Sequence, residues 1–201
     1  MNLSEADIQQ ALDRPGAAGT ALPAGDGLRP ASVLLPLICD AATGWNLLFI
    51  RRTEDVQDHK GQVAFPGGSQ DPEDRDEVAT ALRETWEEVG VLPADVRVLG
   101  RMAKMPTITN YLITPVVGVI PWPYALRLSS EEVSRAFVIP LNWLADARHS
   151  EHRLYRRPNG KEEPVLFYEL YDGELLWGVT AMITRVFLQL LGLESGHTYH
   201  C

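Results

Sequence analysis

Three glutamates lie close together in a segment of the chain that has the periodicity of a helix. At 100° per residue, Glu84, Glu87 and Glu88 fall at about 0°, 300° and 40° on one side of that helix. The less polar positions centre at about 140°, on the opposite side, and comprise Val78, Leu82, Thr85 and Val89. The sequence therefore predicts one helix that buries one face and presents three carboxylates on the other.

Carboxylates crowded into one helical turn repel one another, and a bound cation would relieve that repulsion. Oxygen ligands that leave coordination positions open suit Mg²⁺ or Mn²⁺ shared with a substrate phosphate, whereas zinc favours histidine and cysteine. A solvated acidic face is the alternative, because most charge runs are solvated faces. Gly67 and Gly68 before the helix, and Gly90 and Val91 after it, favour the metal site.

The segment from Gly68 to Val91 resembles the Nudix box. The helical part of that box reads Arg-Glu-x-x-Glu-Glu-x-Gly followed by an apolar residue, and all of these positions are present from Arg83 onward. Upstream, segments 47–52 and 59–68 are similar to the extended signature of the coenzyme A pyrophosphatase branch of the family. The similarity covers most of residues 31–193 through further matches at 114–118, 131–133, 140–141 and 177–181.

The candidate ligands and catalytic residues follow from the helix and from this resemblance. Glu84 and Glu88, one turn apart, are the first metal ligands, whereas Glu87 is either a third ligand or the base that takes a proton from water. The resemblance adds the backbone carbonyl of Gly68, where glycine lets the main chain approach an ion closely. Arg83 lies beside the acidic face, and its planar fork would hold the glutamate ligands in orientation.

A further catalytic candidate lies outside the box. Nudix proteins often supply an extra ligand or base from a position equivalent to Glu131 and Glu132, and we take Glu132 as the candidate. The alternative is an ordinary helix start, because the two acidic residues follow Ser129 and Ser130.

The loop before the helix departs from the generic box by one extra residue. The box places a glutamate six residues after its glycine and eight before its arginine, but these counts reach Asp74 and Arg75 here. In the family that glutamate mainly supports the arginine of the helix. Asp71, Glu73 and Asp74 are nearby substitutes, and we choose Asp74 because it lies on the helix side of the loop.

Candidate substrate-binding residues lie upstream of the glycine loop. Arg51, Arg52 and Lys60 could meet the phosphates of a substrate, including the 3'-phosphate of coenzyme A, although each such side chain is more often solvated. Gln62 and Phe65 are added by the resemblance, and residue type alone would place Phe65 in the core.

The resemblance implies metal-dependent hydrolysis of the diphosphate linkage of coenzyme A or its thioesters. The products would be adenosine 3',5'-bisphosphate and phosphopantetheine or its acyl form. One alternative is a pyrophosphatase acting on another nucleoside diphosphate derivative, such as a nucleotide sugar, a dinucleotide or a nucleoside triphosphate. Another is a non-catalytic nucleotide-sensing module, but such modules usually lose box carboxylates that this chain keeps.

Composition fits one globular enzyme domain. The chain has 201 residues, of which 45% are hydrophobic and 22% charged, and this allows a single well-buried core. We expect an α/β fold, a Nudix-type α/β/α sandwich with a mixed sheet, over residues 31–195. Residues 1–30 are expected to hold a loosely packed helix at 4–14, capped by Ser4, and a flexible lead-in.

Charge and cysteine content limit the expected partners and location. The net charge of -9 argues against polymeric nucleic acid as a partner, and the apolar runs are too short to span a membrane. Only Cys39 and Cys201 occur, which suggests no disulfide framework and a reducing compartment. With no signal-peptide pattern at the N-terminus, we expect a cytoplasmic protein. Because Nudix proteins often pair, a homodimer is among the expected partners.

The remaining elements are predicted from hydrophobic patterns and turn residues. Strands are expected at 31–41, 45–52, 62–65, 96–103, 111–120, 165–171 and 175–179. Helices are expected at 76–89, 141–147 and 180–193, with Gly90 ending the first and Thr180 capping the last. Asp172 and Gly173 predict a hairpin turn.

Overall fold

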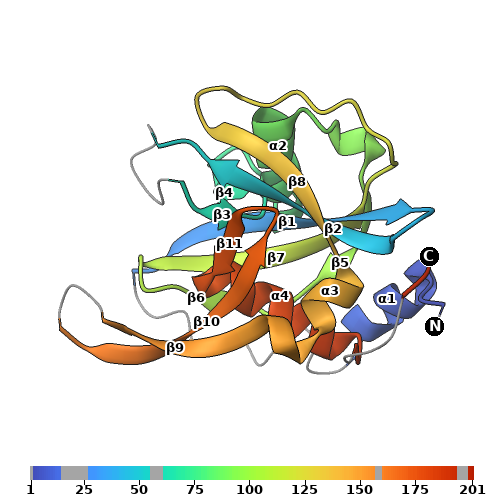
Figure 1. The fold of residues 1–201 in the computed structure, drawn as a ribbon. Helices are drawn as coiled ribbons and strands as arrows, with labels where there is room; N and C mark the ends of the chain where they lie inside the picture. The colour runs from blue at the N-terminus through green and yellow to red at the C-terminus, as the bar shows by residue number, and fades with distance from the viewer. Residues whose placement is uncertain (1, 15–26, 55–60, 157–159, 194–198) are drawn as a thin grey trace.

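The computed structural model describes residues 2–14, 27–54, 61–156, 160–193 and 199–201 (Figure 1). Its main sheet has the order β3-β2-β1-β7-β5, with β4 beside β1, β6 beside β7 and β8 beside β2. The strands of this sheet are β1 (Arg29–Asp40), β2 (Gly44–Arg52), β3 (Val63–Ala64), β4 (Gly67–Ser69), β5 (Arg97–Arg101), β6 (Met105–Pro106), β7 (Tyr111–Val119) and β8 (Val133–Pro140). The sheet is mixed, because β1 and β7 run parallel while the other pairs are antiparallel.

Helices cover both faces of the sheet, as an α/β/α sandwich requires (Figure 1). Helix α2 (Glu77–Val89) packs on one face, with Ala81 and Val89 buried among strand residues such as Leu34 and Ile50. The opposite face carries α1 (Glu5–Leu12), α3 (Leu141–Ala145) and α4 (Gly178–Leu190). Strands β1 and β2 are therefore buried almost throughout, which explains their nearly continuous apolar sequence.

A smaller antiparallel sheet lies on the same side as α4. It has the order β11-β10-β9 and consists of β9 (Ser150–Arg156), β10 (Glu162–Tyr171) and β11 (Glu174–Trp177). Strand β11 contacts β3 of the main sheet. The hairpin between β10 and β11 turns at Asp172 and Gly173, both with positive φ, as predicted.

Helix α2 has the boundaries that its sequence predicts. Its N-cap Asp76 accepts a hydrogen bond from the Ala79 N–H at 2.8 Å. At the other end, Gly90 takes the left-handed conformation with φ of 75° and donates its N–H to the Trp86 carbonyl at 2.9 Å. These caps hold in place the turn that carries the glutamates.

Several predicted elements differ in the structure. The capping box of Ser4 and Asp7 is present, but α1 is not loosely packed, because Ile8 and Leu12 are buried in the main core. Strand β1 begins at Arg29, and most of the predicted lead-in, residues 15–26, lies outside the described residues. Helix α4 starts at Gly178 with Trp177 as its N-cap, so the prediction that Thr180 caps it was wrong.

Strands β4, β6, β8 and β9 were not predicted. Strands β4 and β6 are too short to give an alternating pattern, and β4 consists of Gly67, Gly68 and Ser69. Strand β9 is an exposed edge strand with a charged sequence, so it lacks the apolar alternation of a half-buried strand.

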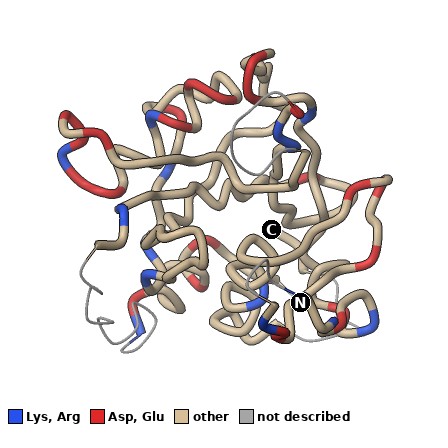
Figure 2. Tube along the Cα trace, turned by 90° about the vertical axis from the view of Figure 1, so that its left-hand side faces the viewer, with Lys and Arg blue, Asp and Glu red and all other residues tan. Residues whose placement is uncertain are grey.

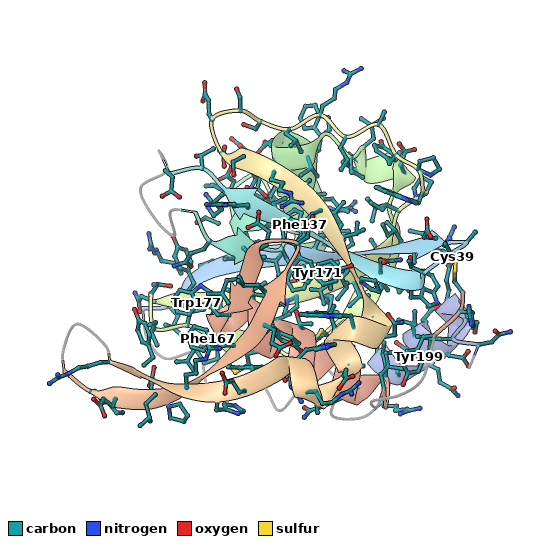
Figure 3. All side chains as sticks on the ribbon, viewed as in Figure 1. Cys39, Phe137, Phe167, Tyr171, Trp177 and Tyr199 are labelled. Carbon is teal, nitrogen blue, oxygen red and sulfur yellow. A yellow bond between two sulfur atoms is a disulfide. The ribbon has the colours of Figure 1, made fainter. Side chains whose placement is uncertain are left out.

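The expectation of unpaired cysteines was also wrong. Cys39 at the end of β1 and Cys201 form a disulfide (Figure 3). Backbone hydrogen bonds bring the chain ends to this place: the Leu3 N–H donates to the His200 carbonyl at 2.9 Å, and the Trp45 N–H donates to the Tyr199 carbonyl at 3.2 Å. The sequence could not show this pairing, because the two cysteines are 162 residues apart. The cysteine content therefore does not indicate a reducing compartment.

Asp and Glu are distributed around the trace rather than gathered on one side (Figure 2). Within the part of the chain that the structure describes, no helix is long and apolar enough to cross a membrane.

Replacing Cys201 with Ser should lower the free energy of unfolding by roughly 2 to 5 kcal/mol, because the disulfide closes a long loop in the unfolded chain. Denaturant unfolding with and without a reducing agent measures this loss. Reductant should destabilise the wild-type protein to the level of the variant and leave the variant unchanged. Equal stability of the oxidised and reduced wild-type protein would contradict the prediction.

Candidate active site

The three glutamates of α2 differ in burial. The Glu88 side chain is 1% exposed, Glu84 is 16% exposed and Glu87 is 44% exposed. The prediction that all three share a solvent face was therefore wrong for Glu88. Strand β4 and Arg52 cover that end of the turn and hold its carboxylate.

Glu88 is a buried carboxylate held by two donors. Its Oε2 accepts a hydrogen bond from the Gly67 N–H at 2.9 Å, and its Oε1 accepts one from Arg52 Nη1 at 3.1 Å. Burial raises the pKa of Glu88 to about 8, although both donors act in the opposite direction. The two donors therefore compensate the ionised Glu88 carboxylate only in part, and a bound cation would supply the remaining positive charge.

Glu84 lies directly against the glycine loop. A Cβ atom added at Gly68 would lie 2.5 Å from the Glu84 carboxylate, so only glycine allows this approach. Burial also raises the pKa of Glu84, and Arg83 opposes the shift. The main chain at Gly68 and the Glu84 carboxylate thus lie side by side, and the sequence predicts both as metal ligands.

Arg83 connects the loop to the acidic turn. Its Nη1 donates to Glu84 Oε1 at 3.0 Å and to Glu87 Oε2 at 2.9 Å, and its Nη2 donates to the Ser69 carbonyl at 3.0 Å. One guanidinium therefore fixes two of the three glutamates and the strand beside them. The sequence predicts an orienting role for Arg83, and these hydrogen bonds are the contacts that such a role needs.

Asp74 supplies the support for Arg83, as predicted. The guanidinium donates from Nε to Asp74 Oδ1 at 3.0 Å and from Nη2 to Asp74 Oδ2 at 2.9 Å, which is a bidentate pair. Asp71 is more distant, at 3.7 Å. The hydrogen bond from Arg83 lowers the pKa of Asp74 to about 2. The longer loop thus replaces the box glutamate with an aspartate.

Glu132 faces the same region from outside the box. It lies in a turn before β8, not at a helix start, and its Oε2 is 4.0 Å from Arg52 Nη2. Arg52 therefore lies between the buried Glu88 and the half-exposed Glu132. Glu131 instead offers its backbone carbonyl to the Thr53 hydroxyl at 2.8 Å.

A cavity of about 460 Å³ opens beside these residues. Its acidic end is bordered by Glu84, Glu87, Glu132 and Arg52. The glycine loop and Gln62 form part of its wall, together with Phe65, which is both buried and part of the lining. The opposite end is mostly apolar and is lined by Val33, Ile113, Val179 and Ile183, with Thr107, Thr109 and Tyr111 nearby.

The predicted substrate-binding residues do not all meet in this cavity. Arg52, Gln62 and Phe65 line it, whereas Arg51 does not and instead pairs with Glu54 and Glu174 at 3.7 Å each. Lys60 lies outside the described residues. Sequence reasoning missed the apolar end, because its residues come from β1, β7 and α4 and converge only in the fold.

Comparison with known proteins identifies the family. Residues 28–158 match the NUDIX domain family. The chain belongs to the Nudix hydrolases. One relative, described as an uncharacterized Nudix hydrolase NudL from Photorhabdus laumondii, is 42% identical over 164 residues, covering 82% of this chain and 86% of the relative. A NudL protein of Escherichia coli K12 is 38% identical over 167 residues, covering 83% and 84%.

A solved structure agrees at the level of the fold. The MutT/nudix family protein from Enterococcus faecalis superposes with a TM-score of 0.52 over 86% of this chain and 71% of that one, at 16% identity. Membership of the family makes this protein a pyrophosphohydrolase.

Nudix hydrolases use divalent metal ions, and the donors present here suit such an ion. Among the described residues, no three Asp, Glu, His or Cys side chains converge closely enough to hold an ion. The α2 glutamates accept hydrogen bonds from Arg83 and Arg52 instead. However, the available donors are carboxylate and carbonyl oxygens, which hard cations prefer. Glu88 is buried and Glu84 is partly buried, both have raised pKa values, and a cation would compensate their charge.

Replacing Asp74 with Asn should lower the free energy of unfolding at pH 7 by roughly 1.5 to 3 kcal/mol, because a buried charge-assisted pair is lost. The folded pKa of Asp74 lies below its unfolded value, so the pair stabilises the protein above about pH 4, and this contribution is lost as the pH falls toward 2. Denaturant unfolding of both proteins across this pH range measures the difference.

Asp71→Asn is the matched control, because Asp71 is 54% exposed and lies 3.7 Å from Arg83, which is beyond hydrogen-bond distance. Its effect should be close to zero. Equal losses in the two variants, or a loss for Asp74→Asn that stays constant from pH 7 to pH 2, would show that Asp74 does not support Arg83 as described.

Proposed function

We propose that this protein hydrolyses the diphosphate linkage of coenzyme A or its thioesters, releasing adenosine 3',5'-bisphosphate and phosphopantetheine or its acyl form. The cofactor is Mg²⁺ or Mn²⁺, because hard oxygen donors and a diphosphate ligand favour these ions. The proposal extends the family assignment, which covers pyrophosphate hydrolysis, to one substrate.

One observation carries the choice of coenzyme A. The segment from 47 to 68, whose sequence resembles the coenzyme A branch, supplies a wall of the cavity through Arg52, Gln62, Phe65, Gly67 and Gly68. This wall faces the glutamates of α2. A segment that distinguishes one branch of a family thus lies where it can contact the substrate rather than in a remote part of the fold.

The two ends of the cavity suit the two parts of such a substrate. The acidic end, together with bound cations, suits the diphosphate. The apolar end between β7 and α4 suits the uncharged pantetheine arm or an acyl chain, because it offers aliphatic surface and the threonines Thr107 and Thr109. A compact nucleoside triphosphate would leave that apolar surface exposed to water.

The residues of the site would divide the chemistry as follows. Glu84, Glu88 and the carbonyl of Gly68 would hold the cation, which supplies charge neutralisation at the diphosphate and activates water when bound. Glu87 has one of two roles, third ligand or base, and its partly exposed carboxylate borders the cavity. Glu132 and Arg52 face the same space, and Arg52 would donate to phosphate oxygens. Arg83 keeps Glu84 and Glu87 in position.

The direct test is a substrate panel analysed by mass spectrometry. Coenzyme A, acetyl-coenzyme A, ADP-ribose, a nucleotide sugar, a dinucleotide and a nucleoside triphosphate are each incubated with the protein and Mg²⁺ or Mn²⁺. Coenzyme A or its thioester should be cleaved fastest, with adenosine 3',5'-bisphosphate as a product. Faster cleavage of ADP-ribose or of the dinucleotide would leave the hydrolase class standing and remove coenzyme A.

Glu88→Gln tests the role of Glu88 as a metal ligand, because glutamine keeps the size of the side chain and can still accept a hydrogen bond from the Gly67 N–H. Its turnover should fall by several orders of magnitude at saturating metal, while its circular dichroism stays that of the wild-type protein. Near-normal turnover in this variant would refute the assignment of Glu88 as a ligand.

A further inference from the structure

A second cavity of about 350 Å³ lies next to the first. It is bounded by β2, by the two residues before β3 and by the β10–β11 hairpin, through Arg51, Gly61, Gln62, Gly173, Glu174, Leu175 and Trp177. Gln62 lines both cavities. The two cavities therefore adjoin at this residue.

Among the described residues that line this second cavity, Arg51 is the only cation. It adjoins Arg52 in β2, and successive side chains of a strand point to opposite faces of the sheet. Accordingly, Arg52 contacts Glu88 of α2, whereas Arg51 lies near Glu174 of β11. Its ion pairs with Glu54 and Glu174 are both 3.7 Å long, beyond hydrogen-bond distance, and its side chain is 42% exposed. A phosphate could therefore bind Arg51 more closely than either carboxylate does.

Glu174 is better neutralised by another arginine. Its buried carboxylate accepts a hydrogen bond from Arg135 Nη1 at 3.1 Å, and Arg135 also pairs with Asp172. The position of Glu174 is thus fixed without Arg51. The carboxylates of Glu54 and Glu174 lie near Arg51 and oppose the approach of an anion. Removing the charge of Glu54 should therefore favour phosphate binding at Arg51.

Trp177 gives the cavity an aromatic wall. Its indole lies beside Phe167 (Figure 3). The two rings are stacked, with centroids 5.3 Å apart and an angle of 9°, and the Tyr155 ring lies at 5.6 Å. These neighbours hold the indole in place, so little conformational freedom is lost when a ligand packs against it. A guanidinium and an aromatic surface in one small cavity suit a phosphorylated purine nucleoside better than an aliphatic ligand.

We propose that the cavity between Arg51 and Trp177 binds the adenosine 3'-phosphate end of the substrate, with the 3'-phosphate at Arg51 and the base against Trp177. This inference rests on the proposed function and adds the orientation of the substrate. The nucleoside occupies the second cavity, the diphosphate lies at the α2 glutamates, and the pantetheine arm occupies the apolar end of the first cavity.

The test compares coenzyme A with 3'-dephospho-coenzyme A. Arg51→Met should lower kcat/KM for coenzyme A roughly tenfold to a hundredfold and leave that for the dephospho form nearly unchanged, since only the first has the 3'-phosphate. Arg51→Lys should restore part of the loss. Glu54→Gln should raise kcat/KM for coenzyme A alone, because it removes a competing negative charge. Trp177→Leu should lower kcat/KM for both compounds, because both carry the base.

Arg148→Met is the matched control, because Arg148 is 86% exposed and lines neither cavity. This variant should have the same kcat/KM as the wild-type protein for both compounds. Thermal unfolding of every variant separates loss of fold from loss of binding. A second readout is independent of cleavage: calorimetry should show tighter binding of adenosine 3',5'-bisphosphate than of AMP to the wild-type protein, and Arg51→Met should abolish the difference.

The outcomes separate the two claims. If the wild-type protein does not cleave coenzyme A, the proposed function fails and the inference fails with it. If coenzyme A is cleaved but Arg51→Met affects both compounds equally, or if the two nucleotides bind alike, only the second cavity is wrongly assigned. Selective loss for coenzyme A supports both claims.

Discussion

The crowding of negative charge on one turn of α2 is the constraint on which the rest of the site depends. Glu84, Glu87 and Glu88 would repel one another in an isolated helix. In the folded protein, Arg83 binds the first two and Arg52 binds the third. Even so, burial keeps the pKa of Glu88 at about 8. The two arginines make the turn compatible with folding and leave an environment that a divalent cation would complete.

This constraint explains features that lie far apart in the sequence. With the Glu84 carboxylate in its present position, there is no room for a Cβ atom at Gly68. Asp74 fixes the far side of the Arg83 guanidinium, so the extra loop residue is accommodated without loss of the bidentate pair. The pairing of β4 with β1 then fixes the glycine loop to the centre of the sheet. The cavity opens where these elements meet.

Local chemistry could be predicted from the sequence, but long-range pairing could not. The α2 boundaries, the turn with three glutamates and the Asp74–Arg83 pair follow from spacing within about 20 residues, where helix periodicity and loop length decide the geometry. The burial of Glu88 depends on Arg52, which is 36 residues away. The Cys39–Cys201 disulfide depends on which chain ends become neighbours. The different partners of Arg51 and Arg52 depend on which strands and helices become neighbours. The sequence pattern of a single segment does not show which other segments it will contact.

The central claim is that the α2 glutamates bind a divalent cation, and Mn²⁺ binding without substrate tests it most directly. Electron paramagnetic resonance of free Mn²⁺ is recorded during titration with the wild-type protein, Glu84→Gln and Glu88→Gln. The account predicts saturable binding by the wild-type protein, competition by Mg²⁺, and affinity at least roughly tenfold weaker in each variant. Equal binding by all three proteins, or none by the wild-type protein, would contradict it.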